Sequence, residues 1–445
     1  MGYRLVRSLI RILLALFYRR VDVVGVGRIP PTGPLIVAAN HHNAVVDAML
    51  IVATFPRPVR VLAKAPLFTN PVIGPFLRLM GGVPVHRRVE AGDDPQKNDA
   101  MFDAAIGALR AGGALLIFPE GTTTPRPTLL PLRTGAARIL LAAVRAGAGH
   151  SGVTLLPVGL VFHDPGTFRA ASAVVMVGPP VEVGDLFDGA GAGDDPRVRA
   201  LTERLAGAIR DQIVEAEDHH TLELLRVLEQ AWHQEQGEAA KDPAAALTWR
   251  RRVMRSARDL EEREPLRVAA LRRRLELYRA NLDEVGIRSD QLDRPYTPGG
   301  VIRYVVENVV TLALGLPVAL WGMACHAAPY LLIGRAVRWL GRTIEEEATY
   351  KMAAGLVFFP LFWLLEAWCL WRVAGVSGVA AFLILLIPSG LLALAWRERL
   401  ERVGRQARAF GRFLTDRRLR EDLRAERRAL VAEATRLAAL TRETP

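Results

Sequence analysis

Short apolar runs alternate with helix-like stretches over the first 185 residues. Six runs rich in Val, Leu and Ile predict buried strands, at 34–39, 57–63, 81–87, 113–119, 153–162 and 172–180. Helical periodicity appears between them, in the stretches 47–55, 97–112 and 133–147. Strands that alternate with helices are typical of an α/β fold. The pattern therefore predicts a domain at residues 21–185 with a mostly parallel sheet flanked by helices.

The first 20 residues have a different pattern. Arg4, Arg7 and Arg11 interrupt an otherwise apolar segment, and the longest run without a charge is far too short to span a bilayer. Residues 1–20 therefore predict an amphipathic helix that lies in the membrane interface. The alternative interpretation is that this segment is the first core helix of the α/β domain.

Long charged stretches follow a glycine-rich linker after Asp185. Residues 196–300 combine helical apolar spacing with opposite charges four residues apart, which predicts a charged helical region with exposed faces. The final segment, 397–445, has the same character and predicts a cytoplasmic amphipathic helical tail.

Residues 301–396 contain three apolar segments long enough to enter or span a bilayer, at 309–333, 352–371 and 373–396. Pro317 and Pro329 predict a broken, re-entrant helix for the first segment. The other two predict a spanning hairpin with its turn at 373–378, which leaves the arginine-rich loops on the cytoplasmic side. Three simple spans are the alternative. We expect an integral membrane protein of the bacterial inner membrane, with its catalytic domain facing the cytoplasm.

The net charge and the cysteine content limit which binding partners and metal sites the sequence supports. The net charge is +12, which suits an anionic membrane surface or a phosphorylated substrate, and we find no nucleic-acid motif. The two cysteines, Cys325 and Cys369, lie in apolar segments and show neither disulfide nor zinc spacing. We therefore expect no metal site.

The stretch "IVAANHHNAVVDAM", residues 36–49, contains candidate catalytic residues. His42 and Asp47 are five positions apart, so they would point about 140° apart within one helix. They can meet if His42 ends the strand or caps the helix that carries Asp47, with Asn43 as a plausible cap. The carboxylate would then hold one ring nitrogen and leave the other free as a base. The alternative is that these are ordinary polar residues of a turn.

A second candidate site follows the strand predicted at 113–119. Glu120 and Gly121 form a turn there, with Arg126 and Arg133 shortly after it. Arg87 ends another strand in "GGVPVHR". Arginines that converge with backbone N–H groups at one edge of a sheet form a natural phosphate site. The alternative is that each of these arginines is a solvated surface charge.

These motifs resemble the glycerolipid acyltransferases that share an H-x-x-x-x-D box. "NHHNAVVD" resembles the first block of that family, with His42 and Asp47 at its key positions. "GGVPVHR", "FPEGT" and "VTLLPVGL" resemble the second, third and fourth blocks, in the same order and at similar spacing. The resemblance covers roughly residues 30–185, and four ordered blocks are far more specific than any single one.

A further likeness concerns one branch of the family. "RPTLLPLRTGAA" and the apolar C-terminal segments resemble the fungal-type glycerol-3-phosphate and dihydroxyacetone-phosphate acyltransferases. In that branch a basic residue stands where Arg133 is, and Arg126 has a counterpart. The third block departs from the common family pattern, because Thr123 occupies the place of an arginine. That departure leaves the acceptor open.

The resemblance implies acyl transfer from a thioester, acyl-CoA or acyl-carrier protein, to the hydroxyl of glycerol 3-phosphate in phospholipid synthesis. His42 would take the hydroxyl proton, and Asp47 would orient it. Arg87, Arg126 and Arg133 would hold the acceptor phosphate, with Glu120 and Gly121 shaping its site. The reaction would need no cofactor or metal. One alternative is a lysophosphatidate (1-acylglycerol-3-phosphate) acyltransferase, and the other is a non-catalytic lipid-binding scaffold in the membrane.

Overall fold

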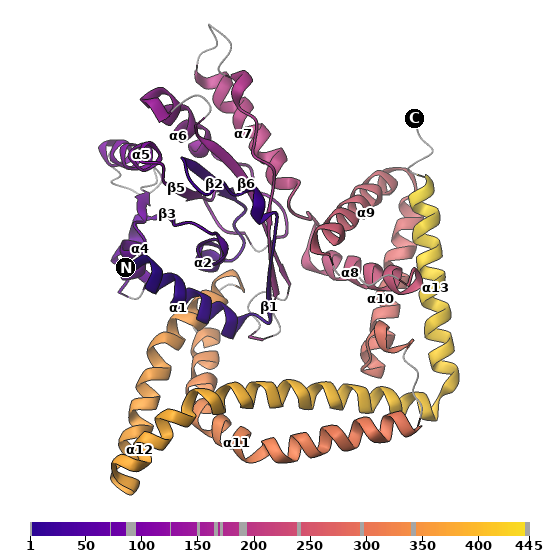
Figure 1. Cartoon of the computed structure of the whole chain (residues 1–445). Helices are drawn as coiled ribbons and strands as arrows, with labels where there is room; N and C mark the ends of the chain where they lie inside the picture. Colours follow the sequence, from indigo (N-terminus) through magenta and orange to yellow (C-terminus); the bar gives the residue numbers. More distant parts are fainter. Residues whose placement is uncertain are drawn as a thin grey trace. The chain divides into compact units, whose positions relative to one another are not determined.

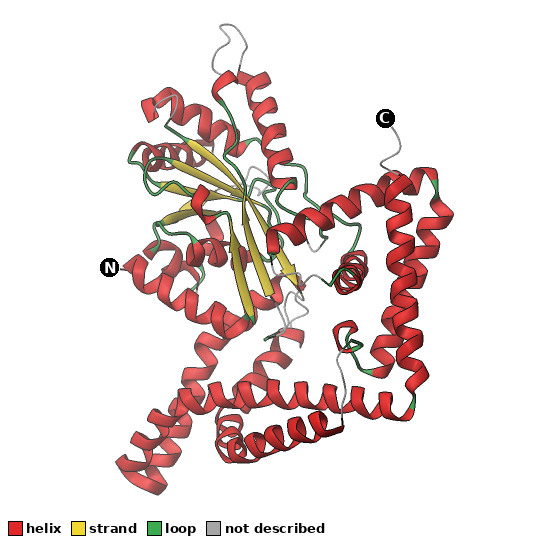
Figure 2. Cartoon of the chain, turned by 45° about the vertical axis from the view of Figure 1, so that its right-hand side comes forward, coloured by secondary structure: helices red, strands yellow, loops and turns green. Residues whose placement is uncertain are grey.

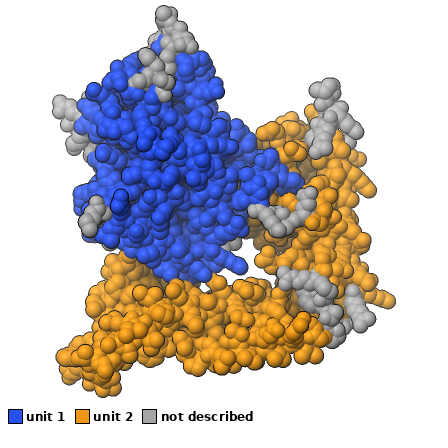
Figure 3. Space-filling view, in the orientation of Figure 1, with its two compact units in different colours: residues 1–219, 242–251, 341–353 blue, residues 220–241, 252–340, 354–445 orange. Residues whose placement is uncertain are grey.

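The computed structural model describes residues 2–71, 73–85, 95–124, 126–148, 152–163, 168–169, 172–186, 194–237, 242–293, 298–339 and 344–440. The chain divides into two compact units, coloured separately in Figure 3. The first comprises residues 1–219, 242–251 and 341–353, and the second comprises residues 220–241, 252–340 and 354–445. The first unit thus extends past the boundary expected at residue 185 and takes in part of the charged helical region.

A seven-stranded sheet forms the centre of the first unit (Figures 1 and 2). Its strands lie in the order β1-β7-β6-β2-β5-β3-β4. Every neighbouring pair is parallel except β6 and β7, so the predicted mostly parallel sheet is confirmed. The strands are β1 Arg20–Val24, β2 Leu35–Ala39, β3 Val59–Lys64, β4 Val83–Val85, β5 Ala114–Ile117, β6 Thr154–His163 and β7 Ser172–Val177.

Each of the six strands predicted from apolar runs is present, and β1 is an additional one. The sequence of β1, "RVDVV", places Arg20 and Asp22 among its valines, so it lacks the continuous apolar run of a central strand. It pairs only with β7 at the edge of the sheet, where one polar side is tolerated.

Helices cover both faces of this sheet. On one face, α1 (Gly2–Phe17), α2 (Ala44–Thr54) and α4 (Ile73–Leu79) pack in a single apolar cluster with the side chains of Val37 and Leu116. On the other face, α5 (Pro95–Arg110), α6 (Gly135–Ala143) and α7 (Asp194–Arg210) pack with Ile36 and Leu115. Successive strand residues point to opposite faces, so an uninterrupted apolar strand serves both clusters. The shorter elements of this unit are η1 (Val26–Arg28), α3 (Ala65–Thr69), η2 (Val144–Ala148) and η3 (Gly184–Leu186).

Helix α1 is a core helix on one face. Val6, Ile10 and Leu14 are buried against the sheet layer, as the alternative interpretation of this segment expected. Its other face leaves Leu5 and Ile12 exposed, at 72% and 57% of their surface. The interface-helix prediction is untested, and an exposed apolar stripe beside Arg4 is compatible with it.

The second unit is helical. Its helices are α8 (His219–Glu235), most of α9 (Pro243–Arg263), α10 (Pro265–Val285), η4 (Ser289–Gln291), α11 (Pro298–Trp339), most of α12 (Ile344–Thr415) and α13 (Arg417–Leu440). A buried arginine ties three of its segments together: Arg427 of α13 pairs with Glu235 at 2.7 Å and with Asp293 at 2.7 Å. Losing Arg427 would remove both ion pairs at once, so this side chain links α13 to the end of α8 and to the segment after η4.

Within the part of the chain that the structure describes, two helices are long and apolar enough to cross a membrane, Gly299–Trp339 and Thr349–Phe413. The predicted break in segment 309–333 is wrong, because α11 continues through Pro317 and Pro329. Proline has a helix-compatible φ, and its cost is a missing N–H bond and a local clash that one helix can absorb. The predicted turn at 373–378 is confirmed by Gly375 within α12, whose φ of 64° and ψ of −160° interrupt the helix.

Candidate active site

The two loops that carry the candidate catalytic and phosphate-binding residues meet at one edge of the sheet. Strand β2 ends at Ala39 and leads into the histidine-containing turn, while the neighbouring parallel strand β5 ends at Ile117 and leads into Glu120. Ala38 lies opposite Ile117 in the register. The carboxyl ends of parallel strands meet at the same edge, where open α/β sheets place their ligand sites.

Asn40 fixes where the turn begins. Its side chain is fully buried and exchanges two hydrogen bonds with the backbone of Leu160 in β6: Nδ2 donates to the carbonyl at 2.9 Å, and Oδ1 accepts the N–H at 2.6 Å. The side chain thus continues the β2–β6 pairing by one residue. Asn40 was not among the predicted site residues, although a polar residue directly after a buried strand is a sequence signal for such a position.

The ring that contacts Asp47 belongs to His41, which corrects the geometry expected from the sequence. His41 Nδ1 lies 2.8 Å from Asp47 Oδ2. Because a carboxylate only accepts, the His41 ring carries its proton on Nδ1 and leaves Nε2 as the free base. The carboxylate is fully buried, while the His41 side chain keeps 17% of its surface exposed. The pair therefore consists of a buried carboxylate and a partly exposed imidazole.

His42 lies on the other side of the turn. Its backbone N–H, not its ring, donates to Asp47 Oδ2 at 2.8 Å. Its ring Nδ1 instead lies 3.2 Å from the carbonyl oxygen of Thr124. Burial lowers the pKa of the His42 imidazole, so the ring is neutral near pH 7 and donates from Nδ1 to that carbonyl.

The turn curls around the Asp47 carboxylate, and this explains the register. Asp47 Oδ2 accepts the N–H groups of His42 and Asn43, both at 2.8 Å, at the start of α2. Because the amides of residues 42 and 43 are directed at Asp47, the preceding residue, His41, is the one whose side chain reaches the same oxygen. Ala44 takes a φ of +43°, a conformation that non-glycine residues rarely adopt and that completes this tight turn.

The buried side chain of Glu120 links the histidine turn to the loop that follows β5. It is only 3% exposed, and its two oxygens accept the backbone N–H groups of His41 at 2.7 Å and Leu130 at 2.9 Å. Phe118, two residues earlier, stacks on the His41 ring with centroids 4.1 Å apart and an interplanar angle of 13°. The Glu120 carboxylate therefore supports the histidine turn and the following loop, and it does not point toward solvent as a direct phosphate contact would.

Gly121 and Arg133 form the outer wall of this loop. Gly121 has a φ of +70°, and a Cβ built on it would lie 2.7 Å from Arg133 Nε, so the arginine side chain lies directly over the glycine. Arg133 and Arg126 are both exposed. Arg87, the third predicted phosphate ligand, lies outside the described residues. The structure thus brings Gly121 and Arg133 together beside the loop that Glu120 ties to His41.

Glu120 should make the stability of the fold depend on pH. Burial raises the pKa of its carboxyl from 4.5 to about 7, so the folded chain binds this proton more tightly than the unfolded chain does. Its contribution to stability is therefore full below about pH 4.5 and is lost as the pH rises to about 7. Glu120→Gln, which cannot ionise, should flatten the change in unfolding temperature between pH 4.5 and 8.

The exposed residue Glu203 of α7 offers a matched control. Glu203→Gln should leave the pH dependence of the unfolding temperature as it is in the wild type. An identical pH dependence for wild type and Glu120→Gln would show that Glu120 is not the titrating group.

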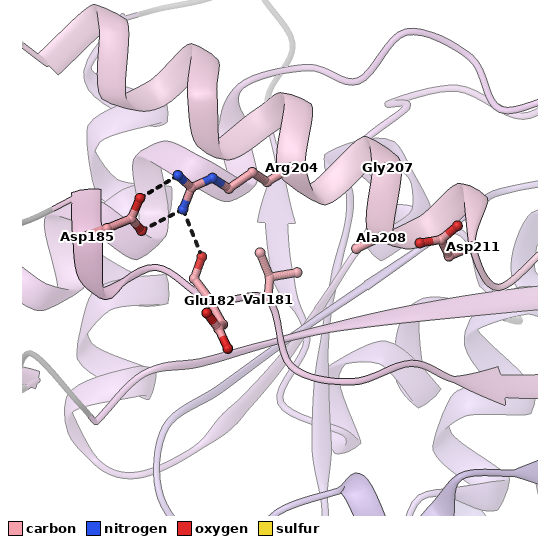
Figure 4. Close-up of a pocket in the computed structure, with 7 residues that line it drawn as sticks. All are labelled: Val181, Glu182, Asp185, Arg204, Gly207, Ala208 and Asp211. Carbon is pink, nitrogen blue, oxygen red and sulfur yellow. Dashed lines mark hydrogen bonds and ion pairs between the residues drawn. The ribbon is translucent and has the colours of Figure 1, made fainter. Parts of the chain in front are cut away.

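A separate surface hollow of about 570 Å³ is lined by α7 and by the segment that follows β7 (Figure 4). Arg204 of α7 bonds there to the carboxylate of Asp185 at 2.6 Å and to the backbone carbonyl of Glu182. Val181 lies beside Leu155 at the start of β6, whereas His41 follows the end of the parallel strand β2. The hollow is therefore distinct from the histidine site. Among the described residues, no group of three or more His, Cys, Asp and Glu side chains is arranged to hold a metal ion.

Comparison with known proteins identifies the domain. Residues 20–161 match the family model described as acyltransferase. The 1-acyl-sn-glycerol-3-phosphate acyltransferase of Borreliella burgdorferi is 29% identical over 48% of this chain and 78% of that protein. Glycerol-3-phosphate O-acyltransferase 2 of Saccharomyces cerevisiae is 27% identical over 44% of this chain and 26% of the yeast protein. An uncharacterised acyltransferase of Schizosaccharomyces pombe is 22% identical over 80% of this chain and 66% of its own length.

A crystal structure of PlsC, a 1-acyl-sn-glycerophosphate acyltransferase from Thermotoga maritima, is also similar, with 22% identity over 47% of this chain and 79% of that one. Its TM-score of 0.34 is low, so the assignment rests on the sequence matches. Residues 20–161 therefore resemble the acyltransferase family, and the two relatives that match this part of the chain are named as acyltransferases. The family resemblance described above is thereby confirmed.

Proposed function

We propose that this chain transfers a fatty acyl group from an acyl thioester to the hydroxyl of glycerol 3-phosphate, with His41 as the general base. The observation that carries the proposal is the His41–Asp47 pair, in which a buried carboxylate holds Nδ1 and the second ring nitrogen is left free. This arrangement orients an imidazole for proton abstraction and stabilises the imidazolium that forms. The proposal moves the base from His42, our expectation from the sequence, to its neighbour.

The reaction balances with these groups alone. His41 Nε2 takes the acceptor's hydroxyl proton as the hydroxyl oxygen attacks the thioester carbonyl carbon. The tetrahedral intermediate then collapses, the carbon–sulfur bond breaks, and the thiolate leaves with the proton that His41 returns. Both cysteines of the chain lie in α11 and α12, and we propose direct transfer to the acceptor without an acyl-enzyme. No cofactor or metal takes part in this scheme.

The acceptor phosphate is proposed to bind Arg133 and Arg126. Both side chains are exposed on the loop that Glu120 ties to the histidine turn, and an arginine fork matches the geometry of a phosphate group. The yeast glycerol-3-phosphate acyltransferase and the sequence resemblance at Arg133 support glycerol 3-phosphate as the acceptor. We propose Arg87 as the third arginine that binds the acceptor phosphate.

A second acceptor is favoured by another observation. The Borreliella relative, whose name gives 1-acyl-sn-glycerol-3-phosphate as its acceptor, is matched over 78% of its length. Both acceptors carry a phosphate and a free glycerol hydroxyl, so the same residues would serve either one. Lysophosphatidate acyltransfer is therefore the second candidate.

A panel of acceptors and donors tests the proposal. Purified full-length protein would be given glycerol 3-phosphate, dihydroxyacetone phosphate or 1-acylglycerol 3-phosphate, each with acyl-CoA or acyl-carrier protein, and the lipid products would be measured. We expect the highest kcat/KM for glycerol 3-phosphate. A higher value for 1-acylglycerol 3-phosphate would select the second candidate, and no transfer to any acceptor would refute both candidates and favour the lipid-binding scaffold.

Arg133→Ala should weaken acceptor binding. A charge-assisted hydrogen bond contributes about 1.5–3 kcal/mol, so we expect the acceptor KM to rise roughly 10- to 150-fold while the donor KM changes little. Arg138→Ala serves as the control, because Arg138 is an exposed arginine one turn into α6. A rise in donor KM alone would place Arg133 at the thioester.

We also propose that the protein is integral to a membrane, with its catalytic unit on the cytoplasmic side. The two apolar helices, α11 and α12, support membrane insertion, and the break at Gly375 supports a hairpin in α12. The start of α12 belongs to the first unit, where Met352 is buried in the core cluster, so we expect Arg338 at the end of α11 to lie on the cytoplasmic side.

Cysteine labelling tests this topology. In a background that lacks Cys325 and Cys369, Arg338→Cys should resist an impermeant thiol reagent applied to intact cells. Val376→Cys, beside the break in α12 and 76% exposed, should react under the same conditions. Labelling of position 338 from outside would support three simple spans.

A further inference from the structure

Tyr18, immediately after α1, is buried beside the catalytic turn. Its side chain is 2% exposed, and its ring lies 5.2 Å from Phe17 and 6.3 Å from Phe162 between centroids. An apolar cage of this kind suits the ring of a tyrosine, but its hydroxyl then needs a polar partner. That partner comes from the turn between β2 and α2.

The partner is Asn43. Its Nδ2 donates to the Tyr18 hydroxyl oxygen at 3.1 Å, and both residues are buried. The backbone N–H of the same Asn43 donates to Asp47 Oδ2 at 2.8 Å, and that oxygen also contacts His41 Nδ1. A continuous chain of contacts therefore runs from Tyr18 through Asn43 and Asp47 to the proposed base.

Two side-chain oxygens of these contacting residues have no hydrogen-bond partner among the described residues. They are Asp47 Oδ1 and Asn43 Oδ1, both buried. Because Asn43 donates to the tyrosine oxygen, the phenolic hydrogen remains available as a donor. Burial and the nearby Asp47 charge raise the pKa of Tyr18, so the phenol keeps that hydrogen throughout the working pH range.

The same helix also holds the other end of α2. Arg11 Nε of α1 donates to the Ala53 carbonyl oxygen at 2.9 Å, and Arg7 donates to the carbonyl oxygen of Phe55. Helix α1 thus braces α2 at its carboxyl end through arginines and at its amino end through Tyr18. Of these contacts, the one made by Tyr18 reaches Asn43, whose backbone N–H binds Asp47.

We propose that Tyr18 is a positioning residue for acyl transfer: its hydroxyl fixes Asn43, and through Asn43 it holds the turn that places Asp47 on His41. The inference rests on the proposed role of His41. This role extends the active site beyond the family's sequence blocks to the end of the N-terminal helix. A displacement of α1 would change the Tyr18–Asn43 hydrogen bond and, through Asn43 and Asp47, the position of His41.

Tyr18→Phe tests this by removing only the hydroxyl. Tyr3→Phe is the matched control, because Tyr3 lies on the same helix and its hydroxyl also accepts one hydrogen bond, from the Val59 N–H at 3.0 Å. Val59 starts β3, so it lies at the edge of the sheet opposite the catalytic turn. Full-length protein would be assayed with saturating donor and acceptor.

We expect Tyr18→Phe to lower kcat about three- to ten-fold with both KM values unchanged, the scale of one hydrogen bond between neutral groups. Asn43→Ala combined with Tyr18→Phe should lower kcat no further than Asn43→Ala alone, since both changes break the same contact. Wild-type kcat in Tyr18→Phe, or an equal fall in Tyr3→Phe, would overturn the proposal.

Amide exchange of the peptide covering 40–47 provides a readout that does not depend on activity. It should exchange faster in Tyr18→Phe and at the wild-type rate in Tyr3→Phe, because the N–H groups of His42 and Asn43 are held by Asp47. If the wild-type protein transfers no acyl chain, the proposed function fails, and this measurement still decides whether Tyr18 positions the turn. Unchanged exchange in Tyr18→Phe would refute that role.

Discussion

His41→Ala is expected to reduce acyl transfer by about 10²–10⁴-fold or more, the scale for loss of a general base. His42→Ala should have a much smaller effect, within roughly ten-fold, because the His42 ring makes one hydrogen bond, to the Thr124 carbonyl oxygen. The reason for the difference is geometric, since only the ring of His41 contacts Asp47. The rates would be measured with saturating donor and acceptor.

The two adjacent histidines serve as controls for each other. Each variant loses one imidazole from the same turn, and unfolding temperatures would show that both remain folded. A larger loss of rate in His42→Ala than in His41→Ala would restore the assignment that the sequence pattern favours.

Asp47→Asn should lower kcat by about 10³–10⁴-fold, a loss comparable to that in a serine protease whose triad aspartate is replaced by asparagine. The substitution keeps the size of the side chain but removes the charge that stabilises a protonated His41, and it permits the wrong ring tautomer. An asparagine oxygen can still accept the N–H groups of His42 and Asn43, so the turn should survive. Steady-state kinetics would measure the loss.

A control for charge removal lies on β1. Asp22 pairs with Arg20 at 2.6 Å in the same unit, at a more exposed position. Asp22→Asn should leave kcat unchanged, because surface ion pairs contribute little. If Asp47→Asn retained kcat within ten-fold of the wild type, the proton would have to be taken by a group that does not need the carboxylate.

The departure of the third block from the family pattern has a structural counterpart. Thr123 stands where the third block of the resembled family carries arginine. Arg133, ten residues after Thr123, lies over Gly121. The left-handed backbone at Gly121 leaves the space that the Arg133 side chain occupies. A positive charge is thus present at this loop although the usual position lacks it, which is compatible with a phosphate-bearing acceptor.

Much of the α/β fold was predictable from local pattern. The six runs of Val, Leu and Ile became strands, because a strand of a parallel sheet is buried on both faces and must be apolar throughout. The edge strand β1 escaped prediction because Arg20 and Asp22 break its apolar pattern. The turn at 373–378 was predicted because it separates two apolar segments, and Gly375 interrupts the helix there with a positive φ that glycine adopts readily.

The site was predictable only in outline. Asp47, the turn that contains both histidines, Glu120 and Gly121 were all identified from the sequence, and the structure brings their loops together at one sheet edge. Sequence spacing favoured His42 because its distance from Asp47 along the chain matches the H-x-x-x-x-D box. It cannot show that Asp47 collects two backbone N–H groups at the helix start, which turns His41 toward the carboxylate.

By itself, then, the sequence determined the parallel sheet and the apolar helices, because both follow from residue type and short-range periodicity. The family and the segments that carry the chemistry came from the resemblance of four ordered motif blocks. Only the tertiary structure decided which histidine meets Asp47, that Glu120 faces inward onto two N–H groups, and that Tyr18 contacts Asn43. These are contacts between segments 6 to 79 residues apart, made by single side-chain atoms. Their geometry depends on how α1, α2 and the loop after β5 pack on the sheet, which no local pattern encodes.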